Sequence, residues 1–101
     1  FALSVLGKGQ QDAAFAFFKP VERDGDNIGG QPFRTGSTGV LILAAARAHV
    51  ECRIVEVVET GDHHIFVGEV VDAGVNGDVE GRPDDASLHM RDLGDKVFYG
   101  G

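Results

Sequence analysis

Hydrophobic and polar residues alternate over residues 1–6, FALSVL, which is the spacing of a β-strand. Residues 10–18, QQDAAFAFF, follow a Gly-Lys-Gly break and are rich in Gln and Ala, so a helix is predicted there. Phe15 and Phe18 would share one face of this helix. Pro20 ends it, because a proline disfavours helical backbone at the residue before it. The chain is therefore predicted to begin with a strand and a short helix.

The longest apolar stretch lies within residues 40–59, and a second apolar segment covers residues 65–75. Val and Ile dominate both, so strands are predicted over about 48–59 and over 65–75. Gly61 and Asp62, between them, suit the central positions of a type II′ hairpin turn. Both strands carry apolar residues on both faces, which is typical of strands buried on both faces. They are expected to form a barrel wall covered by another element or by a partner subunit.

Residues 20–40 carry many glycines and show little periodicity, so a long, ordered but irregular loop is predicted. Residues 76–86, NGDVEGRPDDA, are acidic and polar and are expected to form a surface loop. Together these elements predict a single domain over residues 1–101, mainly β and antiparallel, with one short inserted helix. A small closed barrel would leave the fewest edge strands.

The charge and cysteine content narrow the classes of function. The chain has a net charge of −7 and only 9 Lys and Arg residues, which does not suggest a basic patch for nucleic acid. Cys52 is the single cysteine, so no disulfide forms within the chain, and a reducing compartment such as the cytoplasm is expected. No apolar run approaches the ~20 residues that a membrane-spanning helix needs, so no membrane partner is expected.

The histidines and the cysteine do not form a strong metal signature. His63 and His64 are adjacent, so on a strand they would point to opposite faces. His49 and Glu51 would share one strand face, with Cys52 on the other. These spacings differ from those of common zinc motifs, so no metal site is predicted. Cys52 lies among apolar residues and is interpreted as a small buried hydrophobic residue in preference to a nucleophile.

Three short motifs each allow a structural and a functional interpretation. The GSTG sequence at 36–39 could cradle a phosphate with its backbone and hydroxyl groups, or be a plain loop. Arg34 beside Phe33 could stack on a ring and bind a phosphate, or be a solvated arginine next to a buried anchor. Gly-Asp-His at 61–63 could be an ordinary turn, or could present an imidazole and a carboxylate to a ligand.

The segment 51–73, ECRIVEVVETGDHHIFVGEVVDA, resembles the flavin reductase-like family. The shared features are a Glu-Cys strand, a Gly-Asp-His turn and a Phe-hydrophobic-Gly-Glu-Val strand, in this order. The FALSVL strand with its Gln-containing helix, and the C-terminal LHMRDLGDKVFYGG, are also similar to the family. The resemblance implies a mainly β, antiparallel split β-barrel of the FMN-binding type, with one short inserted helix.

The resemblance also implies a function. Family members are homodimers that hold FMN near the subunit interface and pass a hydride from NADH or NADPH to the flavin, often for a monooxygenase or another electron-acceptor protein. By similarity, Gly61, Asp62 and His63 would contact the dinucleotide. Phe33, Arg34 and Tyr99 would line the flavin or nicotinamide pocket. Because the cofactors carry out the hydride transfer, no dense cluster of catalytic side chains is expected.

Two departures from the family pattern leave alternatives open. The family's Ser/Thr-rich first strands, which carry most flavin contacts, have no counterpart here, so the domain is expected to be incomplete at its N-terminal side. Asp26-Asn27-Ile28 stands where family members often have Asp-Lys-Phe, so a flavin-contacting lysine cannot be transferred. The alternatives are an FMN-binding electron carrier without NADH oxidase activity of its own, or a cofactor-free dimerisation module.

Overall fold

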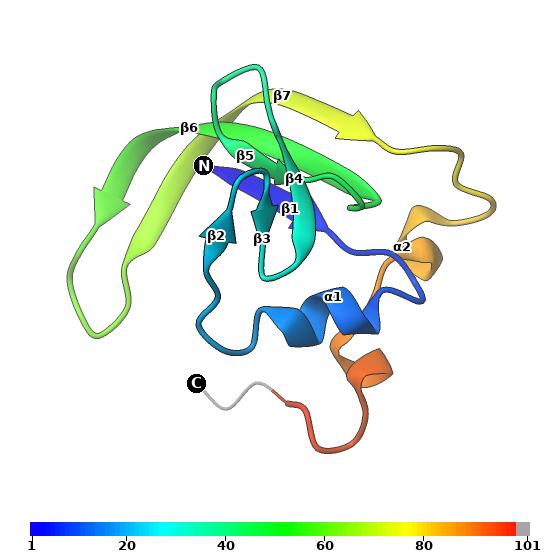
Figure 1. The fold of residues 1–101 in the computed structure, drawn as a ribbon. Helices are drawn as coiled ribbons and strands as arrows, with labels where there is room; N and C mark the ends of the chain where they lie inside the picture. Colours follow the sequence, from blue (N-terminus) through cyan, green and yellow to red (C-terminus); the bar gives the residue numbers. More distant parts are fainter. Residues whose placement is uncertain (99–101) are drawn as a thin grey trace.

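The computed structural model describes residues 1–98 and contains two antiparallel sheets (Figure 1). The first sheet has the order β1-β6-β7, and the second has the order β2-β3-β4-β5. The strands of the first sheet are β1 (Ala2–Val5), β6 (Ala48–Val58) and β7 (Ile65–Val75). Those of the second are β2 (Arg23–Asp24), β3 (Asn27–Ile28), β4 (Gln31–Thr35) and β5 (Leu41–Leu43). The mainly β, antiparallel architecture predicted from the sequence is confirmed.

Among the described residues, three short helical segments lie outside the sheets: α1 (Gln11–Ala16), α2 (Pro83–Ala86) and a 3-10 helix, η1 (Met90–Leu93). The prediction of one helix was therefore too low, and part of the expected loop 76–86 is α2, which has its proline in the first turn. Helix α1 is confirmed but ends at Ala16, and it buries Ala13 while Phe15 and Phe18 remain exposed. Within the described part of the chain, no helix is long and apolar enough to cross a membrane.

The β6–β7 hairpin is the longest element and matches its predicted position closely. The two strands pair antiparallel over most of their length, with irregularities between Glu51 and Cys52 and between Ile54 and Glu56. Such β-bulges insert an extra residue, which accounts for Val55 next to Ile54 and Val71 next to Val70, whereas the apolar run at 65–67 pairs in regular register. The predicted two-residue turn was wrong, because residues 59–64 all lie outside the strands. Gly61 does adopt the expected positive φ, +90°.

The prediction of an irregular loop over residues 20–40 was also wrong. This segment forms β2, β3 and β4, which fold as successive antiparallel hairpins. Gly25, Gly29 and Gly30 have positive φ and supply the reversals between these strands. Strands of two residues, such as β2 and β3, are too short to show an alternating pattern, so only the glycines were visible in the sequence.

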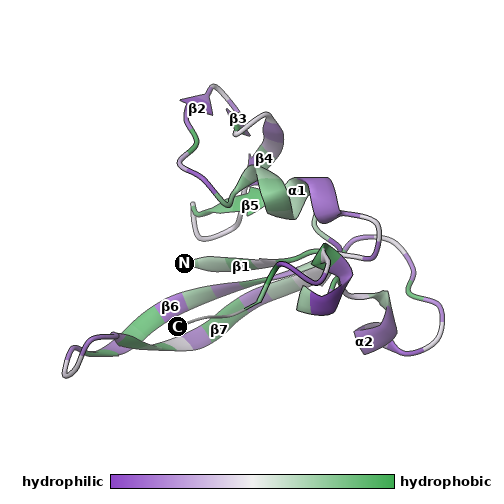
Figure 2. Cartoon of the chain, turned by 90° about the horizontal axis from the view of Figure 1, so that it is seen from below, coloured by the Kyte–Doolittle hydropathy of each residue, from purple (hydrophilic) through white to green (hydrophobic). Residues whose placement is uncertain are grey.

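The core is small and lies where β5 and the beginning of β6 meet β1. Among residues 1–98 its buried apolar residues are Ala13, Ile42, Leu43, Ala46 and Cys52. Burial of Cys52 confirms its interpretation as a core residue. The expectation that β6 and β7 are buried on both faces is not met within the chain, since Ile54 is 46% and Phe66 is 55% exposed. Figure 2 shows the outer part of this hairpin extending away from the second sheet.

Candidate functional site

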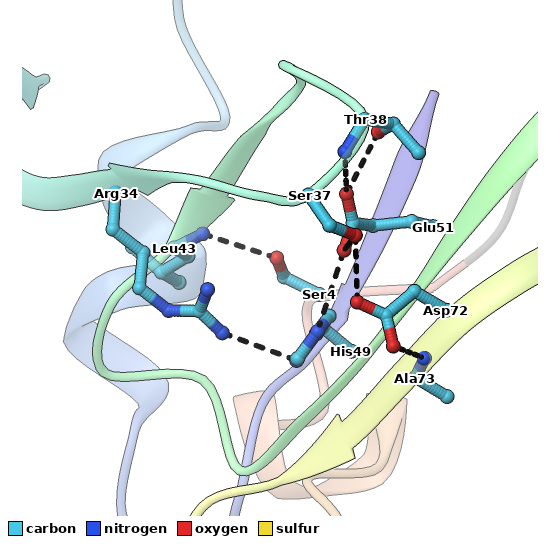
Figure 3. Close-up of polar contacts among 9 residues, drawn as sticks. All are labelled: Ser4, Arg34, Ser37, Thr38, Leu43, His49, Glu51, Asp72 and Ala73. Atoms are coloured by element: carbon cyan, nitrogen blue, oxygen red, sulfur yellow. Dashed lines mark hydrogen bonds and ion pairs between the residues drawn. The ribbon is translucent and has the colours of Figure 1, made fainter.

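The buried carboxylate of Glu51 is the polar centre of the molecule. Glu51 lies on β6 and is only 1% exposed. The backbone N–H of Thr38 donates to its Oε1 at 2.9 Å, and the Thr38 hydroxyl donates to the same oxygen at 2.7 Å (Figure 3). The Ser37 hydroxyl lies 3.2 Å from Oε2. The loop at 36–39 therefore wraps around a carboxylate of its own chain.

These contacts settle which group occupies the GSTG loop. Its Thr38 N–H and both hydroxyls already point at Glu51 or at Asp72, whose Oδ2 lies 2.7 Å from the Ser37 oxygen. The phosphate-cradle interpretation is therefore wrong, and the loop holds Glu51 instead. A Cβ at Gly36 would lie 2.3 Å from Glu51 Oε1, so only glycine allows this approach.

The loop also sets the ionisation of Glu51. The backbone N–H of Thr38 and, next, its hydroxyl lower the pKa of Glu51 from 4.5 to about 2. Burial acts in the opposite direction but is outweighed, because hydrogen bonds to the charged form of a carboxylate stabilise that form. Glu51 is consequently ionised at neutral pH.

His49, two residues before Glu51 on β6, connects the buried carboxylate to an arginine. Its Nε2 lies 4.0 Å from Glu51 Oε2, and Arg34 Nη2 lies 3.4 Å from its Nδ1. Arginine can only donate, so Nδ1 is the acceptor in this contact. A Cβ on Gly74 would lie 2.6 Å from His49 Cε1, so the imidazole packs directly against the backbone of β7.

His49, Glu51 and Asp72 are also the described residues that come nearest to a metal-ligand set, with one atom of each within 4.8 Å of the others. The shared face of His49 and Glu51 was predicted. Asp72 was missed, because only the strand register places it opposite Glu51. The hydroxyl of Ser37 lies within hydrogen-bonding distance of both carboxylates and can donate its one proton to either of them. We assign no metal to this cluster.

The Gly-Asp-His turn lies at the tip of the β6–β7 hairpin. Asp62 Oδ1 and His63 Nδ1 are 2.9 Å apart, and the two side chains are 95% and 68% exposed. The carboxylate orients the imidazole ring, while both groups remain open to solvent. A ligand or a second subunit can therefore reach this pair without any rearrangement of the core.

The other predicted site residues lie elsewhere. Phe33 and Arg34 are neighbours on β4, so their side chains point to opposite faces of the strand. The ring of Phe33 packs edge-on against Phe17 at 6.1 Å between centroids. Figures 1 and 2 both place the tip of the hairpin well away from β4, so the structure does not bring these residues together with the Gly-Asp-His turn. Tyr99 lies outside the described residues.

Two antiparallel sheets, the first of them extended by the long β6–β7 hairpin, define this chain as a mainly β protein of the split-barrel class. The family model described as "Flavin reductase like domain" matches residues 1–93. The chain belongs to the flavin reductase-like family, as its resemblance predicted.

Solved structures support this assignment. An FMN-binding protein from Thermus thermophilus superposes with a TM-score of 0.66 at 37% identity, covering 82% of this chain and 47% of that one. An NADH:FAD oxidoreductase from Streptomyces globisporus, solved with NAD and FAD fragments, superposes with a TM-score of 0.59 at 39% identity, covering 73% and 44%.

A curated relative gives the same result at the level of sequence. The stachydrine N-demethylase reductase subunit of Rhizobium meliloti is 32% identical over 80 residues, which covers 76% of this chain and 34% of the relative. The chain thus spans less than half the length of the curated relatives it matches.

Proposed function

We propose that this chain contributes the nicotinamide-facing part of a flavin reductase, which transfers a hydride from NADH or NADPH to FMN. The observation that carries this proposal is the family match over residues 1–93, with the Gly-Asp-His turn intact and exposed. When bound, the flavin supplies the hydride-accepting chemistry. The chain's own contribution is to bind and orient the dinucleotide through Asp62 and His63, with Gly61 providing the reversal of the backbone.

The residues described here do not complete a flavin site by themselves. A cavity of about 500 Å³ beside the 36–39 loop has the size of a small-molecule pocket and a largely apolar wall. Its polar side chains include Thr38 and Arg53, which already bond to Glu51 and Glu69. A flavin ring would find few free donors there. We therefore derive no step through the flavin from this chain alone.

We propose that a second copy of the chain completes the site, as in the homodimers that the resemblance implies. Support comes from an uncovered apolar surface on the first sheet, here called the hairpin face. It consists of Phe1, Leu3, Ile54, Val57 and Phe66, each at least 37% exposed. Contiguous apolar surface of this kind usually marks an interface. Phe33, Arg34 and Tyr99 remain proposed lining residues of the flavin or nicotinamide pocket.

The protein that accepts the electrons and the cellular compartment are further parts of the proposal. The relative from Rhizobium meliloti is named as the reductase subunit of a demethylase. We propose by similarity that reduced flavin passes to a monooxygenase or another electron-acceptor protein. The single cysteine is free and buried, consistent with a reducing compartment such as the cytoplasm.

Titrating the chain into FMN and following flavin fluorescence tests the proposal directly. We expect saturable quenching at micromolar protein, followed by NADH or NADPH consumption when FMN is added. Quenching without consumption of either nicotinamide would favour the electron-carrier alternative. A chain that never quenches FMN would overturn the flavin-binding proposal and favour the dimerisation module.

Replacing His63 by alanine tests the role of the exposed turn. We expect the apparent KM for the nicotinamide to rise about ten-fold, because the imidazole contacts the dinucleotide, while kcat changes little. Thermal stability should remain within a few degrees, since the side chain is 68% exposed. His64→Ala, at the neighbouring position, is the matched control and should leave the KM unchanged. Equal effects of the two substitutions would remove His63 from the site.

A further inference from the structure

A small cavity lies where β4 and β5 of the second sheet approach the end of β7. Its volume is about 210 Å³, below the roughly 300 Å³ at which pockets for whole drug-sized ligands begin. Its polar lining residues are Arg34, His49 and Asn76. The remainder of its lining is apolar or glycine: Ile42, Leu43, Ala44, Ala46, Gly74 and Val75. A cavity of this size suits a small polar group better than an aromatic ring system.

The one charged residue of this lining, Arg34, is positive, and the nearest carboxylate, Glu51, lies behind the wall at 4.0 Å from His49 Nε2. The protein has 16 acidic residues and a net charge of −7, yet no lining residue of the cavity is acidic. Among residues 1–98, the ion pairs of the structure do not include Arg34. A guanidinium without a carboxylate partner beside a small cavity attracts anions.

The geometry leaves most of the Arg34 donors available. Within residues 1–98 its guanidinium makes one hydrogen-bond contact, to His49 Nδ1, which is long at 3.4 Å and uses one nitrogen. The planar guanidinium can therefore still offer paired N–H groups, the arrangement that binds phosphate and carboxylate with two parallel hydrogen bonds. Asn76, another lining residue, donates a hydrogen bond from its Nδ2 to the Ala44 carbonyl at 3.3 Å, which orients its side chain.

We propose that Arg34, His49 and Asn76 form a binding site for a small oxyanion, namely a phosphate or a carboxylate group. The group is held by the Arg34 guanidinium, and the side chains of His49 and Asn76 complete the polar wall. The site stands on this geometry and does not depend on the proposed reductase activity. The sequence already allowed Arg34, beside Phe33, to bind a phosphate, and the structure adds His49 on β6 and Asn76, which directly follows β7.

The test is a titration of the ¹⁵N-labelled chain with inorganic phosphate at constant ionic strength, balanced with chloride and free of flavin and nicotinamide. We expect saturable shifts of the Arg34 Nε signal and of the His49 and Asn76 amides. Arg34→Gln should weaken the apparent affinity about ten-fold or more, because it removes the charge and the paired donors. Arg23→Gln, an exposed arginine on β2, is the matched control and should bind as the parent does.

Titrations with acetate and with AMP identify which kind of molecule supplies the bound oxyanion. Saturation by acetate on the same residues would show a carboxylate site as well, and tighter binding of AMP than of phosphate would point to the phosphate of a nucleotide. Shifts that never saturate, or that persist equally in Arg34→Gln, mean ionic screening and overturn the site. Because Arg34→Gln could perturb the fold, its amide spectrum away from β4 should first match that of the parent chain.

Discussion

Replacing Glu51 with glutamine is expected to lower the thermal unfolding midpoint at pH 7 on the order of 10 °C. The carboxylate is buried and accepts hydrogen bonds from the Thr38 N–H and hydroxyl at 2.9 and 2.7 Å. Glutamine keeps the shape but weakens these charge-assisted bonds and turns an amide NH₂ toward donors. Since Glu51 fastens the 36–39 loop of the second sheet to β6 of the first, both sheets depend on it.

The same substitution should change the dependence of stability on pH. The pKa of Glu51 in the folded chain is about 2, below its ordinary value of 4.5. A carboxyl whose folded pKa is depressed contributes stability above its unfolded pKa, and this contribution is lost as the pH falls toward the folded pKa. The parent should therefore lose stability between about pH 4.5 and pH 2, and the variant should lose less over this range. The two midpoints should approach each other near pH 2.

Thermal unfolding followed by circular dichroism between pH 2 and pH 7 measures both effects. Glu56→Gln is the matched control, since Glu56 is exposed on the same strand and should shift the midpoint by a few degrees at most. If Glu51→Gln unfolds with the same midpoints as the parent across this range, then Glu51 does not hold the loop.

The hairpin was predictable from sequence because it is long and rich in Val and Ile. The strand predicted over residues 65–75 is observed as Ile65–Val75, and the strand predicted over about 48–59 is observed as Ala48–Val58. The bulges were not predictable. Their effect, apolar residues on consecutive positions such as Ile54 and Val55, looks the same in a sequence as burial on both faces. Only the pairing of β6 with β7 shows whether a bulge or burial on both faces causes such a run.

The polar centre was only half visible in the sequence. His49 and Glu51 are two residues apart on one strand, so alternation alone placed them on one face. Thr38 and Asp72 reach Glu51 from a loop and from another strand, and such contacts depend on tertiary closure that no local pattern encodes. A GSTG sequence shows that an anion could be held by the loop. It does not show that the anion is a glutamate 13 residues away in the chain.

The significance of the Gly-Asp-His turn came from family resemblance and not from geometry. Residues 59–64 form an exposed connection in which the Asp62–His63 pair is the one feature that distinguishes it from an ordinary turn. An exposed ion pair contributes little to stability. Any stronger role for these residues therefore depends on a ligand or a second subunit.

Introducing lysine into the hairpin face is expected to dissociate the proposed dimer. Ile54 and Phe66 are 46% and 55% exposed and, with Phe1 and Leu3, line a surface cavity of about 460 Å³. If a second copy covers this surface, Ile54→Lys combined with Phe66→Lys would bury unpaired charges. Buried hot-spot residues are each worth roughly 2 kcal/mol or more, so association should weaken about 100-fold or more. Sedimentation equilibrium without flavin should show a parent dimer and a monomeric variant.

The control for this experiment lies on the same strand. Val67 follows Phe66, is 43% exposed and points to the opposite face of β7, so Val67→Lys places one lysine on this strand away from the hairpin face. We expect Val67→Lys to remain dimeric. A monomeric parent would rule out self-association through this surface, and dissociation by Val67→Lys to the same extent would place the interface on the other face. Retention of the dimer by the double lysine variant would likewise exclude the hairpin face, and the second copy could not then complete the flavin site there.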